Sequence, residues 1–135
     1  MMSDSSIHPE RTFVPKGWGY EDWIVNKEQY CGKLLFFKKG KKCSLHYHKL
    51  KDEVFYIQSG KIKVLWTDNH DVIKEMSAVI QTGSSTLNET ILEKGDNFHV
   101  PPGRLHQMIA LEDTELFEFS TQHFDSDSIR ILKGD

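Results

Sequence analysis

Three histidines and one glutamate in this chain have the types and the spacing of a metal site. His46 and His48 are two residues apart, and Glu53 follows the polar turn Lys49–Asp52. Side chains at positions i and i+2 of a β-strand point to the same face, so both imidazoles can enter one interior. The run VFYI after Glu53 is strongly β-prone, and a return strand there would bring the carboxylate back to the imidazoles.

His106 supplies the third imidazole, because it follows the segment PPG, whose prolines and glycine force a sharp turn before the next strand. Three imidazoles and one carboxylate suit one divalent transition metal per chain, and Zn, Fe, Mn, Ni and Cu remain open. A bound metal polarises a carbonyl or hydroxyl oxygen, as isomerisation, lyase and dioxygenase chemistry all require. The alternative is that the four residues are ordinary barrel side chains, but burying them without a metal or hydrogen-bond partners would be costly.

The elements that must position these residues are short strands separated by turn signals. Such a pattern predicts an all-β sandwich or barrel. The length of 135 residues predicts a single domain. We expect residues 1–12 to form an N-terminal arm and residues 13–135 to form the barrel. Exposed strand edges need cover, which favours a homodimer.

Several segments show strand patterns of their own. Tyr30–Lys38 is predicted to be a continuous apolar strand, and Lys61–Thr67 alternates polar and apolar residues. Val72–Ile80 fits a short helix or a strand, and Gln81–Asn88 is predicted to be a polar loop. Thr114–Thr121 alternates cleanly.

Glu118 is a possible catalytic group whose direction the pattern leaves open. Phe117 and Phe119 share one face of their strand, and Glu118 lies on the other. If the phenylalanines pack outward, Glu118 enters the barrel. The reverse arrangement makes it a surface carboxylate.

Two basic residues are further candidates. Strand parity with His46 predicts that Lys42 and Ser44 face inward and that Cys43 faces the opposite way. Lys42 also ends a basic run that is either a solvated turn or a rim that attracts phosphate. Arg104 is either a solvated turn residue or a rim contact to an anionic substrate. His99 and His123 are predicted to be structural or exposed rather than metal ligands, and His70 is predicted to be a solvent residue in a turn.

Composition narrows the partners and the compartment. The net charge is -3 with both signs interspersed, which gives no footprint for nucleic acid or an anionic membrane. Apolar runs are short and the N-terminus is polar, so we expect no membrane span, no signal peptide and a cytoplasmic protein. Cys31 and Cys43 are then expected to be reduced strand residues.

The two histidine-bearing stretches resemble the paired motifs of the cupin family. The pattern G-x5-H-x-H-x4-E-x6-G runs from Gly40 to Gly60, and G-x5-P-x-G-x2-H runs from Gly95 to His106. Where the second motif usually ends in Asn, this chain has Ala110. The resemblance implies a jelly-roll, or double-stranded β-helix, barrel and the metal ligands His46, His48, Glu53 and His106.

A narrower resemblance, over residues 13–131, is to the cupin domain of type II mannose-6-phosphate isomerases. It is carried by Trp18-Gly19, by VPPGRLHQM, and by the closing segments Glu118–Gln122 and Asp127–Arg130. Two departures are His46, where those enzymes commonly have Gln, and Lys42, where they commonly have Arg.

The narrower resemblance implies a metal-dependent sugar-phosphate isomerase whose metal holds the sugar oxygens. Lys42 or Arg104 would bind phosphate, and Glu118 would carry the proton. Two other readings stay open: a lyase or dioxygenase acting on a small organic acid, and a non-catalytic cupin that binds a sugar or another metabolite.

Overall fold

The computed structural model describes residues 7–75 and 87–135, and it consists of two antiparallel sheets. In sheet order, the six-stranded sheet contains β1 (Thr12–Lys16), β2 (Gly19–Asn26), β3 (Cys31–Phe37), β10 (Thr114–Ser120), β5 (Glu53–Ser59) and β8 (Asn97–Val100). The five-stranded sheet contains β11 (Ser128–Leu132), β4 (Leu45–His48), β9 (Leu105–Ala110), β6 (Lys61–Thr67) and β7 (Asn88–Glu93). Two short 3₁₀ helices, η1 (His70–Glu75) and η2 (Asp125–Asp127), complete the described elements.

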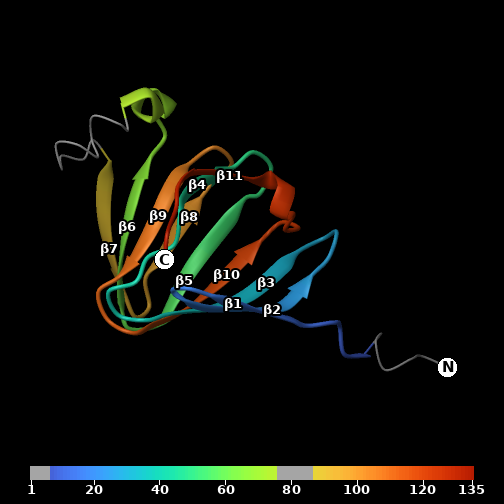
Figure 1. Cartoon of the computed structure of the whole chain (residues 1–135). Helices are drawn as coiled ribbons and strands as arrows, with labels where there is room; N and C mark the ends of the chain where they lie inside the picture. The colour runs from blue at the N-terminus through green and yellow to red at the C-terminus, as the bar shows by residue number, and fades with distance from the viewer. Residues whose placement is uncertain (1–6, 76–86) are drawn as a thin grey trace.

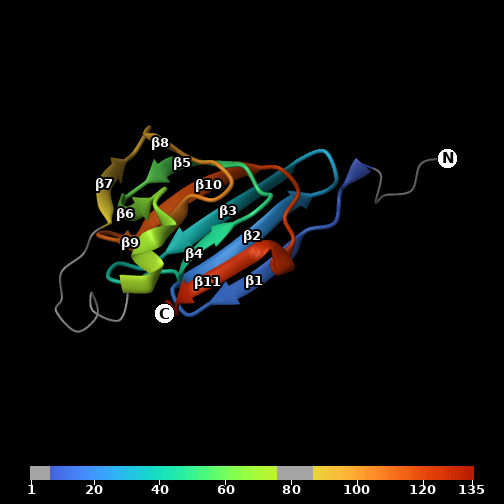
Figure 2. The same ribbon diagram turned by 90° about the horizontal axis from the view of Figure 1, so that it is seen from above.

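The two sheets face each other and form an open-ended barrel (Figures 1 and 2). Strands distant in sequence lie side by side, since β10 pairs with both β3 and β5, and β9 lies between β4 and β6. The predicted all-β jelly-roll barrel is therefore confirmed. Its apolar core is built from side chains of both sheets, among them Phe37, Phe55, Ile57, Ile62 and Val64.

Inward-facing residues alternate with outward-facing ones along β3, although its sequence predicted a continuous apolar strand. Cys31, Lys33, Leu35 and Phe37 are buried, and the residues between them are only partly buried. The alternation is hidden in the sequence because the outer face also carries large apolar residues, Leu34 and Phe36. One lysine, Lys33, thus points into the barrel.

The direction of Glu118 is settled by β10. Leu116 and Glu118 are buried, whereas Phe119 is 55% exposed on the other face. The phenylalanine face of this strand therefore points outward and the Glu118 carboxylate points into the barrel.

The segment predicted as helix or strand, Val72–Ile80, begins within η1, and its residues 76–80 lie outside the described part of the chain. The loop predicted at Gln81–Asn88 also lies largely outside it, and β7 already begins at Asn88. The N-terminal arm over residues 1–12 stays a prediction. Its last residue, Thr12, is already the first residue of β1. Among the described residues, no helix is long and apolar enough to cross a membrane.

Candidate metal site

The three predicted histidine ligands meet where β4 pairs with β9. His46 and His106 are directly opposite each other in this pair, so their side chains share a face. Their ring centroids are 4.4 Å apart, and the rings of His46 and His48 are 5.0 Å apart. One ligand atom from each of the three histidines lies within 4.8 Å of the others, which is close enough for all three to hold one metal ion.

Backbone carbonyls fix the orientation of two of these rings. Nδ1 of His46 lies 2.9 Å from the Ser44 carbonyl oxygen, and Nδ1 of His106 lies 3.0 Å from that of Arg104. A carbonyl only accepts, so an Nδ1 that bonds to it carries the proton and donates it; Nδ1 of His46 also lies 3.1 Å from the Ser44 hydroxyl oxygen. Each Nε2 is then left with a free lone pair, which is the form that binds a metal.

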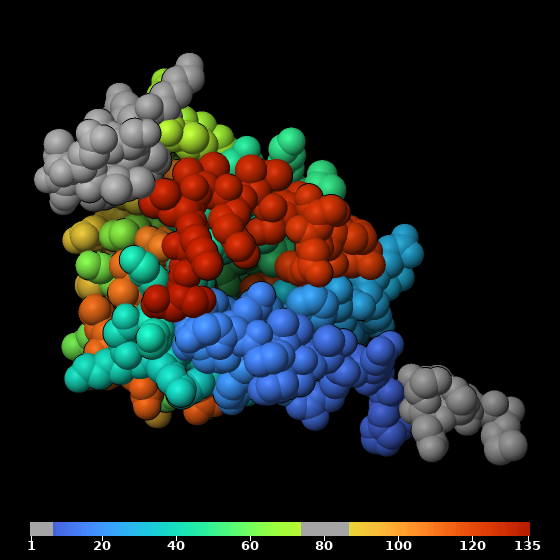
Figure 3. All heavy atoms as spheres, in the orientation of Figure 1, coloured from blue at the N-terminus to red at the C-terminus, as the bar shows by residue number. Residues whose placement is uncertain are grey.

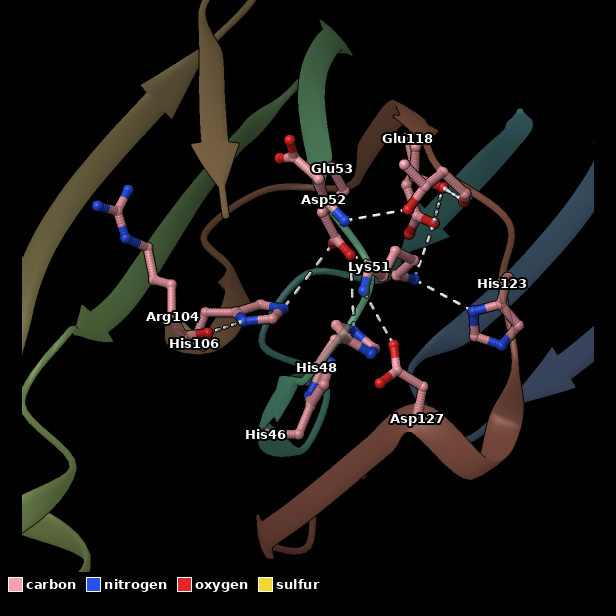
Figure 4. Close-up of polar contacts among 12 residues, drawn as sticks. His46, His48, Lys51, Asp52, Glu53, Arg104, His106, Glu118, His123 and Asp127 are labelled. Carbon is pink, nitrogen blue, oxygen red and sulfur yellow. Dashed lines mark hydrogen bonds and ion pairs between the residues drawn. The ribbon is translucent and has the colours of Figure 1, made fainter. Parts of the chain in front are cut away.

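Glu53, the first residue of β5, brings its carboxylate to the same place. Its Oε2 lies 3.6 Å from Nε2 of His48, and its Oε1 lies 3.9 Å from Nε2 of His106 (Figure 4). Glu53 Oε2 and His48 Nδ1 are buried and have no hydrogen-bond partner among the described residues. An ion pair at 3.2 Å from Lys51 still reaches Glu53 Oε2. A divalent cation suits this donor set, because it would satisfy the buried carboxylate and the imidazole lone pairs together.

Burial keeps the three imidazoles neutral. Desolvation lowers the pKa of His46 to about 4, and it lowers the pKa of His48 and of His106 well below the usual value. Burial and the nearby Glu118 carboxylate raise the pKa of Glu53. Neutral imidazole is the ligand form, and a bound cation would favour the ionised form of Glu53.

The metal site forms one wall of a cavity of about 830 Å³. The apolar lining includes Trp18, Phe55 and Met108. The cavity is also lined by Trp23 and His123, whose rings are in contact with each other. The space-filling view shows a hollow between the red C-terminal segment and the blue N-terminal strands (Figure 3). A cavity of this size can hold a small polar metabolite whose oxygens reach the histidines.

A network of buried charges lies beside the histidines. Lys51 Nζ is 3.1 Å from Glu118 Oε2 and 3.1 Å from Nδ1 of His123 (Figure 4). Lys33 Nζ lies 3.8 Å from the same Glu118 oxygen and 3.5 Å from Glu21. Burial alone would raise the pKa of Glu118, but the two ammonium groups outweigh burial and lower it, so Glu118 is ionised. The Glu118 and Glu53 carboxylates raise the pKa of Lys51 against the opposing effect of its burial.

Asp127 holds the loop that carries Lys51. Its carboxylate accepts backbone N–H groups from Lys49, Leu50 and Lys51 at 2.9–3.0 Å. This loop joins β4 to β5 and therefore sets where Glu53 begins its strand. The closing segment of the chain thus positions the first motif.

We expect the Asp127→Ala variant to unfold about 2 to 4 kcal/mol more easily than wild type, because three amide donors lose a charged acceptor. Urea unfolding measures the difference. Asp125→Ala is the matched control, since that side chain is 88% exposed, and its effect should be below about 1 kcal/mol. Equal effects of the two substitutions would contradict the role given to Asp127.

Lys42 does not face inward as strand parity predicted. Its side chain is exposed and, in the described part of the chain, is not among the residues that line the cavity. The regular strand β4 begins only at Leu45, so the parity set by His46 does not extend back to Lys42. Cys43 likewise departs from its prediction, because it is buried in the main core and lines the cavity.

Arg104 points away from the histidines (Figure 4). Its guanidinium pairs with Asp68 at 2.9 Å and lies over the Trp66 ring at 4.5 Å. His99 is exposed and pairs with Asp52. His70, predicted to be a solvent residue, is instead partly buried and bonds to the Gly103 carbonyl.

Two charged residues of the site, Lys33 and Lys51, were missed by sequence reasoning. The alternation of buried residues in β3 would have placed Lys33 on the inward face with Leu35 and Phe37. No local pattern marks Lys51, which lies in a polar turn. Its direction depends on Asp127, which is 76 residues away in the sequence.

We expect the metal-free protein to lose stability as the pH falls from about 6.5 toward 4. Below about pH 6.5 the unfolded chain protonates His46, His48 and His106, whereas the folded chain keeps them neutral. Each such histidine favours unfolding by about 1.4 kcal/mol per pH unit. Glu53 has the opposite effect, because its raised pKa means that the folded chain binds a proton that the unfolded chain does not. Its contribution to stability therefore offsets that of one of the three histidines. The net loss between pH 6.5 and 5 should be about 2 to 4 kcal/mol.

Urea unfolding at pH 7, 6 and 5 tests this prediction. The His46→Gln variant should show a shallower dependence, by about 1.4 kcal/mol per pH unit, because it lacks one of the groups that titrate only after unfolding. An unchanged slope would show that His46 is not held neutral by the fold.

Comparison with known proteins agrees with this fold. Residues 9–132 match the model of a protein family described as Cupin. No protein with a curated description shows significant sequence similarity to the chain.

Several solved structures share the fold. The capsular polysaccharide assembling protein CapF from Staphylococcus aureus is 16% identical with a TM-score of 0.69, over 98% of this chain and 34% of CapF. Oxalate decarboxylase from Bacillus subtilis is 18% identical with a TM-score of 0.71, over 91% of this chain and 30% of that enzyme. KdgF from Halomonas sp. is 17% identical with a TM-score of 0.64, over 87% of this chain and 89% of KdgF. The chain thus spans about a third of CapF and of the decarboxylase, but most of KdgF.

Proposed function

The chain belongs to the cupin family, and from that premise we propose that it is a metal-dependent enzyme acting on a small carbohydrate. The leading reaction is the isomerisation of a sugar phosphate of the mannose 6-phosphate type. One observation carries the proposal: three neutral histidines with a glutamate form the wall of a cavity that also contains an ionised, buried carboxylate, Glu118.

His46, His48, His106 and Glu53 would hold the metal. When bound, a divalent metal polarises the sugar carbonyl and adjacent hydroxyl oxygens as a Lewis acid. The carbonyl-bonded Nδ1 atoms of His46 and His106 keep both rings oriented toward the site. These contacts hold the ligand set in place before the substrate arrives.

Glu118 and Lys51 are the groups proposed to move protons. An aldose–ketose isomerisation removes the proton from C2 and returns one to C1, and it also moves the hydroxyl proton from O2 to O1. Glu118 is ionised and can accept the proton, and Lys51, 3.1 Å away, carries protons of its own. The pair places a proton acceptor and a proton donor within one hydrogen bond of each other. Because their contact lowers the pKa of Glu118 and raises that of Lys51, the proposed proton transfer requires the substrate to displace this ion pair.

Incubation of the metal-loaded protein with mannose 6-phosphate, followed by NMR, tests the reaction. We expect fructose 6-phosphate to accumulate, with loss of activity when the metal is removed by a chelator. If no fructose 6-phosphate forms, the isomerase proposal fails.

A second candidate is a lyase or dioxygenase acting on a small organic acid. Lys33 and Lys51 are buried in the cavity wall beside the metal site, and ammonium groups suit a carboxylate substrate. Carbon dioxide release or oxygen consumption with oxalate and related acids would favour this candidate. Tight metabolite binding by calorimetry without turnover would instead favour a non-catalytic cupin.

The predicted homodimer also remains a proposal. β1 and β8 are the edge strands of one sheet, and β11 and β7 are the edge strands of the other. Such edges can pair with a second copy. Sedimentation equilibrium of the purified chain would decide between monomer and dimer.

A further inference from the structure

A bulge in β11 places two basic side chains on the cavity side of the barrel. Arg130 is paired with His46, while Leu132 is paired with Leu45, so two residues of β11 correspond to one step of β4. Directly opposite residues of paired strands point to the same face, which puts Arg130 on the side of His46. The extra residue reverses the alternation, and Lys133 returns to that side.

Both side chains line the cavity, as this register requires. Ile131 and Leu132, the residues between them, pack instead in a separate apolar cluster with Leu45. The bulge therefore places Arg130 and Lys133 on the cavity side and the two apolar residues between them in the other cluster. In a regular strand, Arg130 would share a face with Leu132 and not with Lys133.

Lys16 brings a third cation to the same cavity from the opposite sheet. It is the last residue of β1 and also lines the cavity. Gly17, the next residue, is packed so closely on Asp135 that a Cβ atom would lie 2.4 Å from the Asp135 carbonyl carbon. The end of β1 and the end of the chain after β11 are therefore adjacent.

These three basic residues have no ion-pair partner within residues 7–75 and 87–135. In contrast, the two lysines deeper in the cavity, Lys33 and Lys51, are both paired with Glu118. Two acidic lining residues already accept hydrogen bonds: Asp125 accepts one from His123, and Asp135 accepts the backbone N–H of Lys42. Lys16, Arg130, Lys133, Asp125 and Asp135, which we call the mouth of the cavity, therefore carry three cationic side chains against two carboxylates.

We propose that Arg130 and Lys133, assisted by Lys16, form a subsite for the phosphate group of the substrate. This inference rests on the proposed function and names the residues that would bind the phosphate of its substrate. The sugar oxygens reach the histidines, and the phosphate remains at the mouth, where the guanidinium fork of Arg130 matches its oxygens. Lys42 and Arg104 do not take this role, because neither side chain lines the cavity and Arg104 is bound to Asp68.

Calorimetric titration of the metal-loaded protein with mannose 6-phosphate and with mannose tests the subsite. Wild type should bind the phosphorylated sugar at least about tenfold more tightly. Arg130→Gln should remove roughly tenfold of that affinity, and Lys133→Gln a smaller factor, with mannose binding unchanged in both. Lys94→Gln, an exposed charge outside the cavity lining, is the matched control and should behave as wild type.

A second measurement separates the subsite from the activity. Inorganic phosphate added to metal-free protein and followed by ³¹P NMR should show saturable binding that the Arg130→Gln/Lys133→Gln variant loses. Phosphate binding without isomerisation would refute the proposed reaction and support the subsite. Equal affinity for mannose and mannose 6-phosphate in wild type, or unchanged preference in Arg130→Gln, would overturn the subsite.

Discussion

The His106→Ala variant is expected to contain no bound transition metal, whereas the wild-type protein should carry about one ion per chain. His106 is 1% exposed and lies close to both His46 and Glu53, so its removal takes away one of the candidate ligands. Loss of a residue that merely orients a ligand commonly costs roughly 10- to 100-fold in metal affinity, and loss of a ligand should cost more. His48→Ala should have the same effect. Activity should fall with metal content in both variants.

Mass spectrometry of metals in untagged protein measures this result. The matched control is His99→Ala, because His99 is an exposed histidine on β8 that pairs with Asp52. It should retain the full metal content, and circular dichroism should show that all three variants remain folded. Wild-type protein that holds no metal even after reconstitution would contradict the metal site. In that case the histidines would contribute to packing or bind a ligand directly. The non-catalytic, metabolite-binding cupin would then become the leading hypothesis.

The sequence could predict that the three histidines and Glu53 come together because regular strands determine their directions. His46 and His48 lie two residues apart in β4, and the PPG turn places His106 on the neighbouring strand. Gly103 adopts a φ of 89° in that turn, and its N–H donates to the His48 carbonyl at 2.7 Å. A short-range pattern is therefore enough where turns are tight and strands pair directly.

Strand parity failed where the strand was irregular. Lys42 precedes the regular part of β4, and its predicted inward direction was wrong. Arg130 and Lys133 share a face only because of the bulge in β11. No residue type in that segment predicts a bulge. The placement of the two basic side chains at the cavity therefore becomes visible only from the strand register in the folded structure.

The buried charges depend on contacts between distant segments. The ionised state of Glu118 requires two lysines, one from β3 and one from the loop before β5. That loop is fixed by Asp127 near the end of the chain. The sequence could place Glu118 on a strand face, but only the packed barrel supplies the partners that set its charge.

We expect the Glu118→Gln variant to lose about 10²- to 10⁴-fold in kcat while it keeps its metal, if Glu118 carries the proton. Glutamine has nearly the same shape but cannot accept a proton from the substrate. The substitution also leaves Lys33 and Lys51 with less compensating charge, and breaking a buried pair can cost about 3 to 5 kcal/mol of stability. Activity must therefore be compared at a temperature where circular dichroism shows that the variant is folded.

A second substitution separates the chemical effect from the structural one. Adding Lys33→Met to Glu118→Gln removes one of the uncompensated ammonium groups, so it should restore part of the stability but none of the kcat. Glu115→Gln makes the same chemical change on the same strand, three residues away and on the outward face, and should leave kcat unchanged. If Lys33→Met restores kcat together with stability, Glu118 holds the two lysines in place and takes no proton. If stability recovers and kcat does not, the proton transfer is assigned to Glu118 itself.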